Sequence, residues 1–194
     1  MKVLNEKQNR EGPSVWVTRW VDYSSKYGLG YSLSNHMTGV YFNDNTKLVQ
    51  DLDSKQAHFF YREDHTRIDS LKTFGLADYP KELEKKMLLI KHFSEYLNGK
   101  HDDSQDQKPQ VPQGKVPTYV KKWLRTKHAI LFRLNNKVVQ VCFQDNTEIL
   151  ICSDSRLVTY VTKQGTRETW SLKEALESSD QEMIKRLKYA KDIV

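Results

Sequence analysis

Short runs of apolar and polar residues, alternating at least in part, occur in both halves of this chain. In the first half they are Tyr27–Leu33 and Gly39–Phe42. In the second half they are Ala129–Leu134, Val138–Phe143, Glu148–Cys152, Leu157–Val161 and Arg167–Leu172. Runs of this length that are rich in β-branched and aromatic residues are typical of β-strands. Asn43-Asp44 and Asn135-Asn136 lie between neighbouring runs, and Asn and Asp tolerate the left-handed backbone of hairpin turns. The pattern therefore predicts antiparallel meanders.

A helical period follows the predicted strands in each half. Pro80 stands at a favourable first helical position. The apolar residues after it recur every three or four positions, at Leu83, Met87, Ile90, Phe93 and Leu97. Ser179 or Asp180 can cap a second helix. Its apolar positions are Met183, Leu187 and Ala190. Each helix is thus expected to present one apolar stripe to a sheet.

The two halves repeat one another. The hexapeptide FNDNTK, which starts at Phe42, is answered by FQDNTE, which starts 101 residues later at Phe143. Trp20 and Trp123 stand 103 residues apart. Between the copies, the segment 98–116 is polar, contains two prolines and has no apolar period, which indicates a linker. We therefore predict one unit of sheet plus helix that is used twice, and two such sheets would bury their free faces against each other.

Composition fits a folded domain that is neither secreted nor membrane-embedded. The chain has 194 residues, of which 38% are hydrophobic and 29% are charged. No run reaches the roughly 18–20 apolar residues of a membrane span, and the start has no apolar signal segment. Cys142 and Cys152 form no C-x-x-C pair, so we expect an intracellular protein with ordinary buried thiols. The net charge of +6 is compatible with acidic partners but does not require them.

Catalytic and metal-binding motifs are absent from the sequence. Gly28-x-Gly30 lacks the third glycine of a phosphate-binding loop, and no nucleophile elbow, zincin motif or kinase motif occurs. None of the six histidines lies at zinc-site spacing from a cysteine. Asp44 and Asp145 lie in predicted turns, where turn formation accounts for them. We therefore expect no catalytic residues, no metal and no cofactor.

Basic residues gather before and within the second meander. They are Lys121, Lys122, Arg125, Lys127, Arg133 and Lys137. This group is either a solvated face of the sheet or a surface that binds nucleic acid or another polyanion. Tyr119, Trp123 and Phe132 lie near it, and they either stack on bases or fill the core.

The run Trp16–Tyr31 resembles the opening of the first polo box of the polo-like kinases. The match continues through Gly39–Thr46, Lys85–Phe93, Trp123–Thr126 and Val139–Val141, and it covers residues 15–194. The resemblance implies an α+β fold, mainly β, with two boxes that each form a six-stranded antiparallel sheet plus a C-terminal helix, packed as a β-sandwich. The expected boundaries are an N-terminal extension or cap remnant at 1–14, box 1 at 15–98, a linker at 99–117 and box 2 at 118–194.

The resemblance also implies a function. Polo boxes bind phosphorylated Ser/Thr peptides between the two boxes and thereby dock the kinase on mitotic targets at centrosomes and kinetochores. The kinase domain that precedes the boxes in the family is not in this chain. We therefore expect a non-catalytic part of a Ser/Thr kinase that acts in the nucleus and cytoplasm, at centrosomes or spindle poles and at kinetochores. Its expected partners are proteins or phosphoproteins.

Two peptide-contacting surfaces follow from the resemblance. Trp20 matches the box 1 tryptophan that packs on the residue before the phosphorylated one, although core packing is an alternative role. The family's hydrophobic groove beside box 1 is matched by Val21, Tyr23, Tyr27, Leu89, His92, Phe93 and Tyr96. His92 stands where an aromatic tyrosine is usual. This groove is expected to be largely retained.

The phosphate-binding pair of the family is changed. A histidine and a lysine clamp the phosphate in the family, and Asn146 and Glu148 stand at these positions. Cys142 stands where the family usually has an asparagine that contacts the peptide backbone. A carboxylate repels a phosphate that carries a charge of about −1.5 to −2. We therefore predict that dependence on phosphorylation is weakened or lost.

Other possibilities stay open. If phosphate is bound, Arg125, Lys127 or Lys122 would have to reach it. A second hypothesis is a polyanion-binding surface, with nucleic acid the less favoured partner. A third is self-association into a homodimer, or docking on the protein's own kinase domain.

Overall fold

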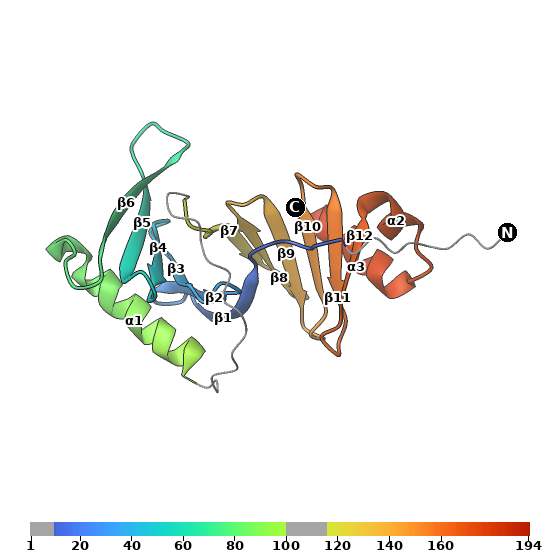
Figure 1. Ribbon diagram of the computed structural model, residues 1–194, viewed down its shortest axis with the longest axis horizontal. Helices are drawn as coiled ribbons and strands as arrows, with labels where there is room; N and C mark the ends of the chain where they lie inside the picture. Colours follow the sequence, from blue (N-terminus) through green and yellow to red (C-terminus); the bar gives the residue numbers. More distant parts are fainter. Residues whose placement is uncertain (1–9, 100–115) are drawn as a thin grey trace. The chain divides into compact units, whose positions relative to one another are not determined.

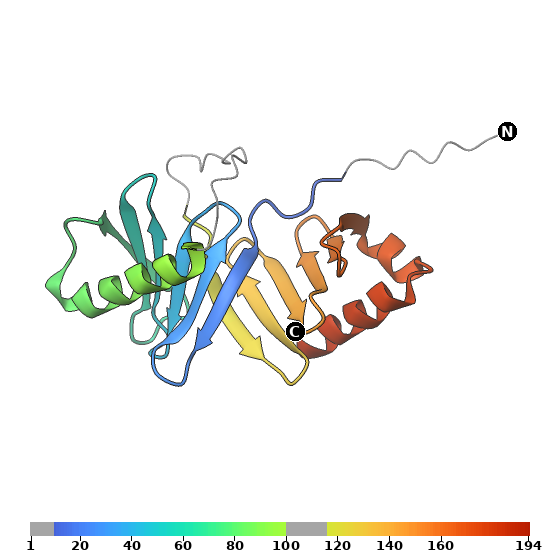
Figure 2. The same cartoon turned by 90° about the horizontal axis from the view of Figure 1, so that it is seen from below.

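The computed structural model describes residues 10–99 and 116–194, which form two compact units (Figure 1). One unit contains residues 15–121, and the other contains residues 122–194 together with the segment that ends at Ser14. Each unit is a sheet covered on one face by helices (Figures 1 and 2). We refer to them as the first and the second unit, and each is described by itself.

The first unit is built on a six-stranded antiparallel meander in the order β1-β2-β3-β4-β5-β6. The strands are β1 (Val17–Tyr23), β2 (Gly28–Leu33), β3 (Thr38–Phe42), β4 (Lys47–Asp51), β5 (Gln56–Arg62) and β6 (Asp69–Gly75). A short 3-10 helix, η1 (Lys81–Leu83), leads into the long helix α1 (Glu84–Asn98). Successive side chains of a strand point to opposite faces of the sheet, so every second residue, such as Val40 and Phe42 of β3, faces α1. The buried members of this core are Val40, Phe42, Leu48, Ala57, Phe59, Leu83, Met87, Ile90 and Phe93.

The second unit repeats this plan with sheet order β12-β11-β10-β9-β8-β7. Its strands are β7 (Val120–Arg125), β8 (Ala129–Leu134), β9 (Val138–Phe143), β10 (Glu148–Cys152), β11 (Leu157–Val161) and β12 (Arg167–Ser171). Two helices follow, α2 (Leu172–Glu177) and α3 (Gln181–Ile193). The predicted stripe Met183, Leu187 and Ala190 is buried in the core of this unit. The prediction of two six-stranded antiparallel sheets with helices is confirmed. The sandwich packing of the two sheets and the domain boundaries stay predictions.

The helices differ from the prediction in two details. The second unit closes with two helices instead of one, because Ser171 begins α2 with a capping box in which its side chain and that of Glu174 exchange hydrogen bonds with the backbone. Asp180 caps α3 by accepting from the Met183 N–H at 3.0 Å, as predicted. Pro80 is not the first residue of the long helix. It is the N-cap of η1, so the α-helical bonds of α1 start only at Glu84.

The hairpin turns lie where they were predicted, but the left-handed residue is displaced. In the β3–β4 turn this residue is Asn45, with φ 66°, instead of Asn43 or Asp44. In the β8–β9 turn it is Lys137, with φ 63°, instead of Asn135 or Asn136. The side chain of Asn136 instead accepts a hydrogen bond from the Val138 N–H. The asparagines thus stabilise the turns partly through their side chains.

Residues 10–14 belong to the second unit. The Arg10 guanidinium pairs with Glu174 of α2. Gly12 lies so close to the sheet that a Cβ there would stand 2.8 Å from Thr159 Oγ1. The predicted linker lies almost wholly outside the described residues.

Candidate functional site

The turn between β9 and β10 carries Asn146, the first of the two positions expected to hold the phosphate-binding pair. We call these positions, Asn146 and Glu148, the pincer positions. Asp145 Oδ1 accepts hydrogen bonds from the N–H and the hydroxyl of Thr147, at 3.2 and 2.6 Å. The Phe143 N–H donates to the Thr147 carbonyl at 2.9 Å and closes the hairpin. Asn146 has φ 65°, a left-handed conformation that asparagine tolerates. Asn146 is therefore held at the exposed tip of a tight turn.

Arg186 of α3 anchors this turn to the helix. Its Nε donates to Thr147 Oγ1 at 2.6 Å, its Nη2 pairs with Asp145, and the guanidinium lies 5.6 Å from the centre of the Phe143 ring. Partial burial by itself would raise the pKa of Asp145, but the hydrogen bonds from Thr147 and Arg186 outweigh it and lower this pKa to about 2. The turn is thus fixed to the helix by a charge-assisted clamp.

The first unit contains the same device. Asp44 Oδ1 accepts from the N–H and hydroxyl of Thr46, and Asn45 is the left-handed residue. Lys86 of α1 donates to Asp44 Oδ2 at 2.5 Å and to Thr46 Oγ1 at 2.6 Å, and its ammonium lies 5.0 Å from the centre of the Phe42 ring. Lys86 and Arg186 stand 100 residues apart, which is the spacing of the helical repeat. Extending the repeat to charged positions could have found this pair.

The second predicted pincer position, Glu148, lies at the start of β10. Its carboxylate accepts from Gln140 Nε2 at 3.0 Å. Burial raises the pKa of Glu148, and the hydrogen bond from Gln140 and the charge of Arg167 counteract this only in part. Cys142 lies opposite Glu148 on β9, and burial raises the pKa of its thiol. Glu148 therefore presents a half-buried acid at the second of these two positions.

The structure brings cations near the Asn146 turn that sequence reasoning had not selected. Lys163 Nζ, from the β11–β12 turn, lies 3.8 Å from Asp145 Oδ2. Arg167 follows that turn and interacts electrostatically with Glu148. Arg125 and Lys127, which had been selected, are exposed residues at and after the end of β7. The Lys127 carbonyl accepts from Gln144 Nε2 at 2.8 Å, so the β7–β8 turn is tied to the Asn146 turn.

The predicted hydrophobic groove involves β1 and α1 of the first unit. The Tyr23 and Phe93 rings meet edge to face with centroids 6.1 Å apart. Val21 and Leu89 both pack on the core of the unit. Phe93 itself is buried, only 7% exposed, so it supports the groove more than it offers free surface.

The remaining groove residues and Trp20 are more exposed. His92 and Tyr96 lie on the outer side of α1, and His92 Nδ1 is 3.9 Å from Glu95 Oε2. Tyr27 is half-buried, with the Lys26 ammonium 5.1 Å from its ring centre. Trp20 is half-buried on β1, opposite Tyr31 of β2. The roles of these residues in binding stay predictions.

Other kinds of site find no support among residues 10–99 and 116–194. No group of three or more His, Cys, Asp or Glu side chains in these ranges is arranged to hold a metal ion. The helices described here include none with the length and apolar character needed to cross a membrane.

Comparison with known proteins assigns this arrangement to one family model. The model described as "POLO box duplicated region" matches residues 25–87 and again residues 126–187. The "Probable serine/threonine-protein kinase CCRP1" of Zea mays is 47% identical over 162 residues, which is 84% of this chain and 26% of that protein. "Serine/threonine-protein kinase PLK1" of Xenopus tropicalis is 33% identical over 187 residues, covering 94% of this chain and 30% of that protein. The chain thus spans between a quarter and a third of the length of these relatives.

Solved structures share the fold. The polo-box domain of budding yeast Cdc5 superposes with a TM-score of 0.77 at 22% identity, over 98% of this chain and 80% of that one. Its complex with an Spc72 phosphopeptide gives 0.77 at 24% identity, over 93% and 70% of the two chains. Its complex with the Dbf4 polo-interacting region gives 0.75 at 23% identity, over 98% and 75%. At these identities the likeness shows the fold alone.

Proposed function

The chain belongs to the POLO box family, and from this we propose that it is a protein-interaction module that recognises peptide segments of partner proteins with little or no dependence on phosphorylation. The Cdc5 domain, which shares this fold, is seen with an Spc72 phosphopeptide and with the Dbf4 polo-interacting region. Peptide binding is the activity of the Cdc5 domain that we carry over to this chain. The loss of phosphate dependence is inferred from this chain's own residues.

The charge at the pincer positions supports this proposal. A lysine about 4 Å from a phosphate oxygen is worth about 4 kcal/mol at an effective dielectric constant near 20, and a carboxylate at the same place reverses the sign. A micromolar complex is worth only about 8 kcal/mol in total. Asn146 can donate one hydrogen bond but brings no charge. Glu148 accepts a hydrogen bond from Gln140 and interacts with the charge of Arg167. Neither interaction makes its carboxylate a ligand for phosphate.

The hydrophobic groove of β1 and α1 provides a surface that can bind a peptide without a phosphate group. Val21 and Leu89 are only partly buried against the core, and Tyr23 is 49% exposed. Apolar area of this kind contributes about 25 cal/mol per Å² when a partner covers it. This surface supports recognition through side chains instead of through a modified residue.

Paired peptides test the proposal directly. We expect calorimetric titration with a Ser-Ser peptide and its phosphoserine form to give affinities within tenfold of each other. The double variant N146H/E148K restores both family side chains and is expected to raise the preference for the phosphorylated form at least tenfold. N45H, the same exchange at the equivalent left-handed turn position of the first unit, is the matched control. A tenfold preference in the unaltered protein would remove the proposal.

Phosphopeptide binding through other cations is the second candidate, and the position of Lys163 favours it. This ammonium lies 3.8 Å from Asp145, within the same group of turns as Asn146. If the unaltered protein prefers the phosphorylated peptide, we expect K163Q to abolish that preference, and K122Q, R125Q and K127Q test the cations selected from the sequence.

The role of a longer protein is a further proposal. The relatives are Ser/Thr protein kinases that the chain covers only in part. We propose that this region targets such a kinase to partner proteins during mitosis, in the nucleus and cytoplasm and at centrosomes, spindle poles and kinetochores. Docking on the protein's own kinase domain and homodimer formation are compatible with this role, and light scattering tests the second.

A further inference from the structure

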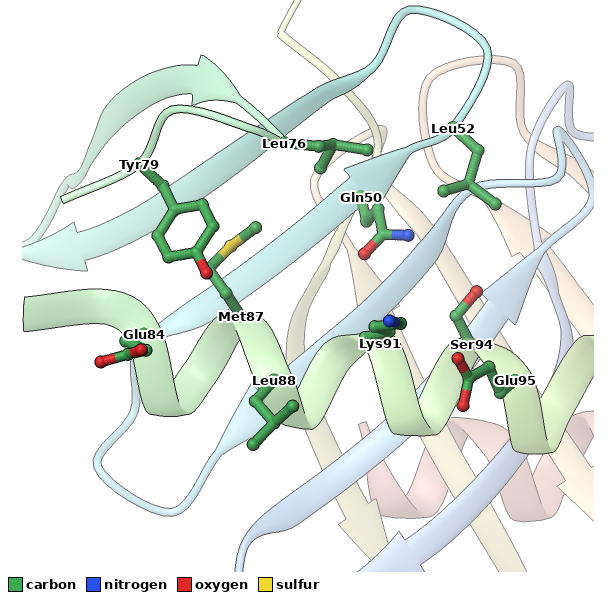
Figure 3. Close-up of a pocket in the computed structure, with 10 residues that line it drawn as sticks. All are labelled: Gln50, Leu52, Leu76, Tyr79, Glu84, Met87, Leu88, Lys91, Ser94 and Glu95. Carbon is green, nitrogen blue, oxygen red and sulfur yellow. The ribbon is translucent and has the colours of Figure 1, made fainter. Parts of the chain in front are cut away.

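A pocket of about 580 Å³ lies along helix α1 of the first unit (Figure 3). It opens between α1, the end of β4 and the segment that follows β6. The predicted hydrophobic groove instead uses β1, which is the opposite edge strand of the sheet. The volume falls within the range of about 300–1,000 Å³ that is usual for ligand sites. The pocket is thus separate from the groove already described.

The walls of the pocket are mainly apolar. Leu76 and Tyr79 come from the segment after β6, Leu52 from the β4–β5 turn, and Met87 and Leu88 from α1. Leu52 is 54% exposed and Leu88 is 56% exposed. Leu88 does not belong to the stripe by which α1 packs on the sheet. These side chains offer one aliphatic ligand group a place to bury its surface.

A buried polar side chain points into the pocket. Gln50 of β4 is 7% exposed, its side-chain amide makes no hydrogen bond within residues 10–99 and 116–194, and the amide atoms still reach the solvent of the pocket. Figure 3 shows the amide directed from the strand toward α1. A buried amide needs one acceptor and one donor, which water supplies in an open pocket. A peptide bond offers the same two groups and would replace that water.

The charged lining makes the pocket acidic. Glu84 and Glu95 contribute two carboxylates and Lys91 one ammonium, although the chain as a whole carries +6. The Ser94 hydroxyl is already engaged with Thr38, at 3.3 Å. Carboxylates at the rim attract a cationic side chain and repel phosphate.

We propose that this pocket is a second docking site, which binds an extended, unphosphorylated peptide segment of a partner protein. An aliphatic side chain of that segment lies between Leu76 and Leu88, its backbone amide bonds Gln50, and a neighbouring Arg or Lys faces Glu84 or Glu95. The proposal rests on peptide binding as the module's function. It does not depend on the residues at the pincer positions.

A titration of the full chain with blocked dipeptides, followed by 1H–15N NMR, tests the site. The probes are N-acetyl-Leu-Arg-amide, N-acetyl-Leu-Glu-amide and N-acetyl-Gly-Arg-amide. We expect N-acetyl-Leu-Arg-amide to shift the signals of Gln50 and Leu88 and to bind at least fivefold more tightly than the other two. Q50L, which keeps the size and removes the amide, is expected to weaken binding at least fivefold. L88S is expected to do the same, and L71S, an exposed leucine of β6, is its matched control.

Several results would overturn the proposal. Equal affinity for the three dipeptides would exclude recognition of both the aliphatic and the basic side chain. Shifts centred on β1 or on the Asn146 turn would assign the peptide to another surface, and a dimer that buries Leu88 would make a second copy the occupant. None of these probes carries a phosphorylatable residue. A failure here is therefore distinct from a failure of the paired-peptide titration, which reads the second unit.

Discussion

Replacing Arg186 with methionine is expected to destabilise the second unit by about 2–3 kcal/mol. The Arg186 side chain is 12% exposed and holds Asp145, which is 31% exposed, as well as the Thr147 hydroxyl. Hydrogen bonds to charged groups contribute about 1.5–3 kcal/mol each, and solvent at the Asp145 carboxylate reduces this. The lost contact with the Phe143 ring adds about 0.5–1 kcal/mol. Methionine keeps most of the aliphatic stem, so the exchange removes mainly the charge.

The pH dependence of this effect has a definite sign. The pKa of Asp145 is about 2 in the folded protein, below the unfolded value of about 3.9. A group with a lowered pKa stabilises the fold above its unfolded pKa, and this contribution is lost as pH falls toward the folded pKa. The difference in stability between the unaltered protein and R186M is therefore expected to narrow from pH 6 to pH 3.

Urea unfolding followed by tryptophan fluorescence measures both quantities. K86M makes the same exchange at the clamp of the first unit and serves as the matched control. K86M should lower the stability of the first unit and leave the urea midpoint of the second unit unchanged. If the difference in the free energy of unfolding between R186M and the unaltered protein is the same at pH 3 as at pH 6, Arg186 acts through packing and the charge-based reasoning is wrong.

Three further substitutions probe separate features. G30A places a Cβ 2.3 Å from Phe93 Cδ1, and thermal unfolding should show a loss of about 1–3 kcal/mol; an unchanged midpoint would mean that the ring yields freely. K47M breaks an ion pair whose side chains are both 2% exposed and should cost about 3 kcal/mol in urea, whereas K47M combined with D69N should recover most of it; equal loss in both variants would exclude a charge effect. Burial raises the pKa of Glu148 above its unfolded value, so stability falls as pH rises through the folded pKa. E148Q should remove this fall, and parallel stability curves for E148Q and the unaltered protein from pH 4 to pH 8 would contradict it.

Most strands of the second sheet were predictable from sequence because they are short runs rich in β-branched and aromatic residues. Strands β8 to β12 agree with the predicted runs to within one residue, and the duplicated Asp-Asn-Thr segment marks one turn in each copy. Strand β7, and β1, β4, β5 and β6 of the first copy, were not predicted as individual runs. Helix α2 was missed because its six residues are too few to show a helical period. The Ser-x-x-Glu pattern that begins at Ser171 is the sequence signal that could have revealed it.

The candidate site was predictable only in part. A single side chain such as Asn146 can be selected by matching a motif, but its anchoring depends on Arg186, which lies 40 residues later and meets the turn only in the folded sheet. Gln50 appears in the sequence as an ordinary polar residue of a strand. Its place in the wall of a pocket follows from the position of α1, which no local pattern encodes.

In the order of the sequence, the first unit is inserted between two segments of the second unit. The polypeptide leaves one compact unit after Ser14 and re-enters it at Lys122. Deleting residues 10–14 would therefore remove part of the second unit. The deletion would take away the Arg10 partner of Glu174 and expose the hydroxyl groups of Thr159 and Thr169, which lie 2.9 Å apart. A pulling force applied at the N-terminal end of residues 10–14 would likewise act on the second unit before it reaches the first.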